Sequence, residues 1–219
     1  MDILKAFISW SGGKESSLAC YRAMTKGGQV VCLVNMLSED GIYSRSHGIG
    51  SELLRLQAEA IGIPIIQRKT TWESYEKEFK NTILQLKKED IKAGVFGDID
   101  LQEHRDWVER VCRETGIKAI LPLWNEAREK LLKEFIDLGF KAIVCSTNSE
   151  FLGKEWLGRQ IDDDFIKDLK NLGNIDICGE KGEYHTFVYD GPIFKKAVKF
   201  RIVDRVIKDG KWFLKIERE

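Results

Sequence analysis

The residues best suited to chemistry in this chain form a glycine-containing turn near its start. An apolar segment that begins at residue 3 runs into the sequence SGGKES, and a helical pattern follows at once. Gly12 and Gly13 have no side chains, so their backbone N–H groups can approach an anion closely. The positive end of the helix dipole and the ammonium group of Lys14 favour negative charge at the same point. The turn therefore predicts a phosphate site made of Ser11, Gly12, Gly13, Lys14, Glu15 and Ser16.

The spacing of this turn excludes the Walker form of phosphate loop. Glu15 follows Lys14 where that loop requires Ser or Thr, and Ile8 occupies the position of its first glycine. A tight strand-to-helix turn without any ligand is the alternative interpretation. The preceding apolar strand, the two serines and the lysine favour phosphate binding.

A second polar segment, residues 178–186, lies in the last third of the chain and reads CGEKGEYHT. Its glycines free the backbone, while its other side chains offer hydrogen-bond donors, acceptors and a titratable imidazole within one short stretch. A polar β-turn without further function is the alternative. We favour a substrate site whose binding residues are Gly179, Glu180, Gly182, Glu183, Tyr184, His185 and Thr186.

Two single residues fall beside the expected nucleotide position. Asp98 follows an apolar strand, and its carboxylate suits Mg²⁺ on nucleotide phosphates as well as the N-cap of a helix that starts near Asp100. His47 lies in a loop between a strand and a helix, where it is either solvated or close to the nucleotide. Both alternatives stay open for each residue.

Strands and helices that alternate must position these groups. The pattern predicts strand 29–36, helix 51–61, strand 64–69, helix 73–89, strand 93–97, helix 101–115 and strand 118–121, after an opening strand and helix 15–26. Residues 30–34 are apolar throughout, as in a parallel strand covered on both faces. We therefore expect a doubly wound α/β fold with a mainly parallel sheet and with ligands bound beyond the carboxyl ends of its strands.

The last third of the chain changes character. A helix over 128–138 and a strand over 140–146 are followed by a period-2 pattern at 198–202, which Asp209-Gly210 separates from the apolar-rich residues 212–216. This pattern predicts a β-hairpin. We expect a phosphate-binding α/β domain over residues 1–122, for which the resemblance described below implies ATP, and a smaller α+β substrate domain over residues 123–219.

Composition limits the classes of function. The 35 basic and 35 acidic residues cancel, which disfavours a dedicated nucleic-acid-binding module. The 5 cysteines form no Cys-x-x-Cys pair, so we expect buried, reduced thiols. No signal peptide or membrane-length apolar stretch is found, and a cytoplasmic protein without membrane contact is expected.

The two polar segments together with shorter motifs resemble the diphthine–ammonia ligase family of the N-type ATP pyrophosphatases, the PP-loop superfamily. The resemblance extends from end to end and rests on SGGKES, His47, QAEAIGIP at 57–64, GDI at 97–99, Val111-Cys112, PLW at 122–124, Leu157-Gly158 and CGEKGEYHTFVYDGP at 178–192. Two departures are Glu15, where the superfamily usually has Asp, and the segment before His47, which lacks the customary methionine. The resemblance implies an adenine nucleotide alpha hydrolase-like (HUP, Rossmann-like) fold.

The resemblance also implies a function: ligation of ammonium to a carboxylate with ATP and Mg²⁺, through an adenylate that releases pyrophosphate. The implied protein substrate is translation elongation factor two carrying diphthine. The loop residues with His47 and Asp98 would bind ATP, Asp98 would hold the metal, and Lys14 would act in catalysis. Glu183 or His185 would take a proton from the attacking ammonium. A homodimer is an option for the assembly.

Two alternatives are kept. One is another PP-loop ATP pyrophosphatase with a different acceptor, either a small molecule or tRNA, although tRNA thiolation normally requires paired cysteines and a basic surface. The other is a non-catalytic regulator that binds ATP or AMP, which leaves residues 182–186 without a role. The nucleotide product separates the enzymes, which form AMP, from the regulator, which leaves ATP intact.

Overall fold

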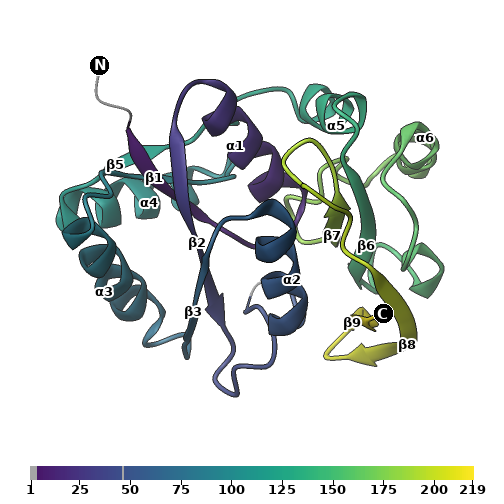
Figure 1. The fold of residues 1–219 in the computed structure, drawn as a ribbon. Coiled ribbons are helices and arrows are strands. Elements are labelled where there is room, and N and C mark those ends of the chain that lie inside the picture. The colour runs from purple at the N-terminus through teal and green to yellow at the C-terminus, as the bar shows by residue number, and fades with distance from the viewer. Residues whose placement is uncertain (1–3, 46) are drawn as a thin grey trace.

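The computed structural model describes residues 4–45 and 47–219, which are drawn in Figure 1. Its first half contains β1 (Lys5–Ser9), α1 (Lys14–Thr25), β2 (Gln29–Leu37), α2 (Ser51–Ile61), β3 (Ile65–Lys69), α3 (Tyr75–Lys88), β4 (Ala93–Val95), α4 (Gln102–Thr115) and β5 (Lys118–Ile120). The second half contains α5 (Arg128–Asp137), β6 (Lys141–Asn148), the 3-10 turn η1 (Lys154–Trp156), α6 (Asp163–Leu172), β7 (Tyr184–Asp190), β8 (Phe200–Lys208) and β9 (Lys211–Arg218).

The first sheet has 5 strands in the order β3-β2-β1-β4-β5, and all neighbouring strands are parallel. Successive residues of β1 point to opposite faces, so Phe7 packs with α3 and α4 whereas Ala6 and Ile8 pack with α1 and α2. Helices therefore cover both faces, and Figure 1 shows α3 and α4 on the side away from the second sheet. The predicted doubly wound α/β fold is confirmed.

The second sheet is antiparallel, with 4 strands in the order β7-β6-β9-β8. The predicted hairpin joins β8 to β9 through Asp209 and Gly210, whose φ values of 49° and 73° are those of a type I′ turn. The sequence predicted no helix at the position of α6, and it predicted a loop where β7 begins. One apolar cluster runs from β1 through α1 to β7 and β9, so both parts share a core. The boundary between residues 122 and 123 stays a prediction.

All 5 cysteines are buried and unpaired, as expected. Among the described residues, no helix has the length and apolarity needed to span a bilayer.

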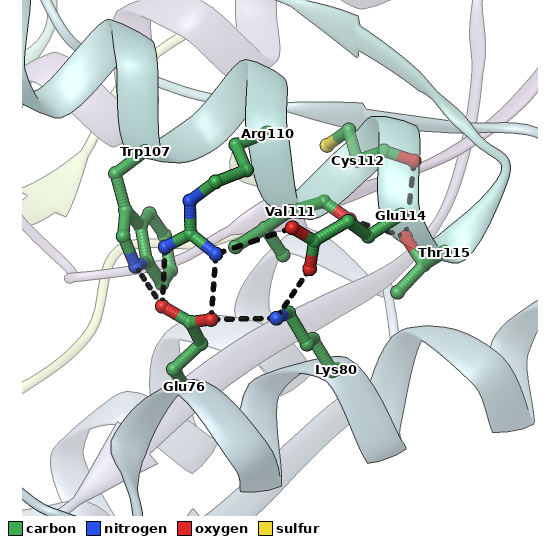
Figure 2. Close-up of polar contacts among 8 residues, drawn as sticks. All are labelled: Glu76, Lys80, Trp107, Arg110, Val111, Cys112, Glu114 and Thr115. Carbon is green, nitrogen blue, oxygen red and sulfur yellow. Dashed lines mark hydrogen bonds and ion pairs between the residues drawn. The ribbon is translucent and has the colours of Figure 1, made fainter.

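Helices α3 and α4 are joined by a polar network, which Figure 2 shows. The Glu76 carboxylate accepts hydrogen bonds from Trp107 Nε1 at 2.9 Å and from Arg110 at 2.6 and 2.8 Å, and it pairs with Lys80 at 2.5 Å. Glu114 pairs with Lys80 from the opposite side, also at 2.5 Å. Because Trp107 also lines a cavity of about 670 Å³, the network holds one wall of that cavity in place.

Replacing Glu76 with Gln is expected to lower the melting temperature, because the variant loses charge-assisted bonds to Arg110 and Lys80. Arg110 holds the pKa of Glu76 well below its usual range, so the stabilisation is present above that range and is lost as the pH falls. Calorimetry at low and high salt measures the effect, which should shrink in high salt. Glu78→Gln on the same helix is the matched control. An equal loss in both variants would contradict the role of the network.

Candidate active site

A cavity of about 670 Å³ opens at the carboxyl ends of β1 and β4. Such a position, where the chain turns back to the other half of a parallel sheet, is the usual ligand site of these folds. Both predicted polar segments face this cavity. The predicted residues that line it are Ser11, Lys14, Glu15, Ser16, His47, Asp98, Gly179, Glu180, Gly182, Tyr184, His185 and Thr186.

The two glycines of the phosphate loop allow close packing rather than line the cavity. Gly12 has φ +80°, and a Cβ there would lie 2.5 Å from Leu54 Cδ2. A Cβ on Gly13 would lie 2.9 Å from His47 Cε1. Ser16 Oγ donates to the Gly13 carbonyl at 3.0 Å and holds the turn at the start of α1. Any side chain in place of either glycine would push the loop away from its neighbours.

The position of Lys14 in a turn predicts an exposed, mobile cation, but the structure shows a buried side chain. It is the first residue of α1 and is only 5% exposed. Its Nζ donates to the Cys178 carbonyl at 2.6 Å, pairs with Glu15 at 2.6 Å and lies 4.6 Å from the centre of the Tyr184 ring. Burial alone would lower the pKa of Lys14, but the Glu15 carboxylate keeps this pKa above its usual value. Lys14 therefore is a fixed positive charge between the two polar segments.

Strand β7 lies directly against the phosphate loop. The Lys14 backbone N–H donates to Thr186 Oγ1 at 3.0 Å, and the Val188 N–H donates to the Gly12 carbonyl at 3.0 Å. The segment 178–186 thus faces the nucleotide loop across one cavity.

Gln57 is a positioning residue that the sequence reading did not single out. It is 0% exposed, and its Oε1 accepts from Trp10 Nε1 at 2.9 Å. Its Nε2 donates to the Gly12 carbonyl at 2.9 Å and to the Val188 carbonyl at 2.6 Å. The side-chain amide of Gln57 therefore connects α2 to the end of β1, to the phosphate loop and to β7. Gln57 could have been found from the sequence, because it is a glutamine on the apolar face of a predicted helix.

His47 and His185 stack on each other beside the phosphate loop, with ring centres 4.3 Å apart and an angle of 29° between the planes. Burial, with a contribution from Lys14, lowers the pKa of His185 to about 4. Burial and the neighbouring His185 hold the pKa of His47 well below its usual range. His47 Nδ1 is buried without a hydrogen-bond partner among the described residues. The two imidazoles are therefore neutral near neutral pH.

Glu183 is engaged within its own loop. It is 1% exposed, and its carboxylate accepts from the backbone N–H groups of Asp176 and Lys181, both at 3.0 Å. It is not among the residues that line the cavity. Its role as a proton acceptor stays a prediction, and the geometry favours a role in holding the loop.

Comparison with known proteins identifies the family. The family described as diphthamide synthase N-terminal domain matches residues 4–119, and the diphthamide synthase C-terminal domain matches residues 127–219. The chain belongs to the diphthamide synthase family.

Relatives of the diphthamide synthase family carry the name diphthine–ammonia ligase. The one from Schizosaccharomyces pombe is 31% identical over 86% of this chain and 34% of its own length. The one from Rattus norvegicus is 28% identical over 93% of this chain and 85% of its own length. This chain thus spans about a third of the S. pombe protein. A solved structure described as a predicted subunit of tRNA methyltransferase from Methanocaldococcus jannaschii is 17% identical, with a TM-score of 0.47 over 89% of this chain and 100% of that one.

Asp98 was predicted either to hold a metal or to cap a helix, and it lines the cavity. It is not the N-cap of α4, because that helix has Leu101 at its N-cap and no side-chain cap, so the N-cap alternative is wrong. Asp98 Oδ1 lies 3.1 Å from His104 Nδ1, and both residues line the cavity. No group of three or more His, Cys, Asp or Glu in the described part of the chain forms a metal site. A single carboxylate fits Mg²⁺, which takes most of its other ligands from water and nucleotide phosphates.

Proposed function

We propose that the protein is an ATP-dependent diphthine–ammonia ligase, which adenylates the carboxylate of diphthine on translation elongation factor two and amidates it with ammonium. The observation that supports this most directly is the meeting of the two polar segments in one cavity, with β7 hydrogen-bonded to the phosphate loop. The family of the chain and the names of its relatives agree with the proposal.

Each part of the cavity has a role in this proposal. A carboxylate repels nucleophiles and has no good leaving group, whereas an acyl-adenylate releases AMP readily. Lys14, the N-terminus of α1 and the Ser11 hydroxyl would stabilise the charge that develops on the departing pyrophosphate. Mg²⁺ at Asp98 would neutralise phosphate charge. The neutral His185, which lines the same cavity, would orient the acceptor carboxylate by hydrogen bonding.

Identification of the nucleotide product tests the proposal. The protein is incubated with ATP, Mg²⁺, ammonium and elongation factor two that carries diphthine. We expect AMP, pyrophosphate and a protein product whose carboxyl has become an amide, as detected by chromatography and mass spectrometry. In a control reaction without ammonium, no amide should form.

The other products would contradict the proposal in different ways. ADP would exclude the adenylation step. AMP formed only with another acceptor would keep the chemistry but replace diphthine. No turnover with any acceptor, together with ATP binding, would identify a regulator. The domain boundary, a homodimer and a cytoplasmic location are parts of the proposal that need separate measurements.

A further inference from the structure

Ammonium must lose a proton before it can attack an acyl-adenylate, because the protonated form has no lone pair. The proposed function therefore needs a proton acceptor in the cavity. Of the two acceptors considered from the sequence, Glu183 has both carboxylate oxygens bonded to backbone N–H groups. His185 is a weak base near neutral pH, because burial and Lys14 lower its pKa to about 4. A different group in the same cavity is required.

We propose that Glu180 is the catalytic residue that takes the proton from ammonium. It lies in the same 178–186 segment, is half-buried and lines the cavity that also contains the phosphate loop. Within residues 4–45 and 47–219, its carboxylate accepts no hydrogen bond and forms no ion pair, whereas the Glu183 carboxylate is bonded to two backbone N–H groups and does not line the cavity. This carboxylate is therefore free to accept a hydrogen bond from a ligand in the cavity.

The charges around Glu180 suit this role. Burial and the nearby carboxylates of Glu15 and Asp100 raise the pKa of Glu180 to about 7, against the opposing effects of Lys14 and Arg128. Lys14 is already paired with Glu15, and Arg128 is paired with Asp100 at 2.6 Å and with Asp176. His104, from α4, and the Cys178 thiol also interact with Glu180. A general base works best when its pKa is close to the working pH.

The proposed step balances in protons and electrons. The Glu180 carboxylate takes one proton from ammonium, which leaves neutral ammonia and a carboxylic acid. The ammonia lone pair forms the C–N bond to the acyl carbon, and the C–O bond to AMP breaks with its electron pair on the departing phosphate. The surplus proton on nitrogen passes to solvent, and Glu180 then releases its own proton to solvent.

The test uses Glu180→Gln and separates the two half-reactions. This inference rests on the proposed function, so the wild-type protein must first form AMP and amide; if it does not, the proposed function and this inference both fail. In the variant, exchange of labelled pyrophosphate into ATP should stay close to wild type. Amide formation from ammonium should fall by about a hundredfold or more. Lys181→Ala, at the exposed neighbour in the same loop, is the control and should keep the wild-type rate.

A change of nucleophile distinguishes a base from a structural residue. Hydroxylamine is largely unprotonated near neutral pH, so Glu180→Gln should form the hydroxamate at nearly the wild-type rate. With ammonium, the wild-type rate should rise up to a pH of about 7, where Glu180 loses its proton, and then level off, whereas the slower rate of the variant should keep rising with the fraction of free ammonia. A variant that keeps the wild-type rate with ammonium, or one that loses pyrophosphate exchange and hydroxamate formation as well, would overturn the assignment while leaving the ligase function intact.

Discussion

Replacing Lys14 with Met is expected to reduce pyrophosphate formation by about a hundredfold or more, because it removes the fixed positive charge beside the departing phosphates. The variant should also melt at a lower temperature. Glu15 and the Cys178 carbonyl each lose their contact to the ammonium group, and a buried charge without its partner is costly. ATP binding by calorimetric titration, pyrophosphate release and thermal unfolding measure these effects.

A control variant and a double variant complete this experiment. Lys26→Met, at the exposed end of the same helix, should behave like wild type. Adding Glu15→Gln to Lys14→Met should recover part of the lost stability, because the unpaired carboxylate is gone, without restoring turnover. A folded Lys14→Met protein with wild-type ATP affinity would show that the loop is only structural.

Replacing Gln57 with Leu is expected to destabilise the protein by about 3–5 kcal/mol, because Trp10 Nε1 and the carbonyls of Gly12 and Val188 lose a buried partner. ATP affinity should fall as well, since the Gly12 carbonyl then keeps only its hydrogen bond from the Val188 N–H. Chemical denaturation and calorimetric titration measure the two effects. Gln85→Leu, at an exposed position of α3, should change stability by less than about 0.5 kcal/mol.

The Gln57→Glu variant tests whether residue 57 must donate hydrogen bonds to the carbonyls of Gly12 and Val188. An ionised carboxylate would face two carbonyl oxygens in a fully buried site, whereas its protonated form can still donate to one of them. The pKa of this introduced group should therefore be raised, and the destabilisation should grow as the pH rises through it. A loss of stability that is independent of pH would contradict this account of the Gln57 contacts.

Most helix and strand positions could be predicted because they depend on local patterns. Apolar periodicity and a few Gly and Pro residues place α1 to α5 and the parallel strands within a few residues of their observed bounds. The phosphate loop could be found for the same reason, since its chemistry is contained in six consecutive residues. Helix α6 also has an apolar row in Phe165, Ile166 and Leu169, with Asp162 as a side-chain N-cap, so a signal for it was present.

The contacts that complete the site could not be predicted, because they join residues far apart in sequence. Lys14 meets Cys178 and Thr186 only after the second sheet has packed on α1, and this packing decides that its side chain is buried. Glu180 and Glu183 are three residues apart and chemically alike. Only the folded loop shows that one binds backbone N–H groups while the other faces the cavity.

The bonds between β7 and the phosphate loop also have a consequence for synthesis on the ribosome. SGGKES emerges well before Thr186 and Val188, whose side-chain hydroxyl and backbone N–H hold it. A nascent chain that lacks β7 therefore has the loop sequence without its fixed geometry, and Lys14 has no Cys178 carbonyl to bind. ATP would be cleaved only by chains that already possess the segment that receives the activated group.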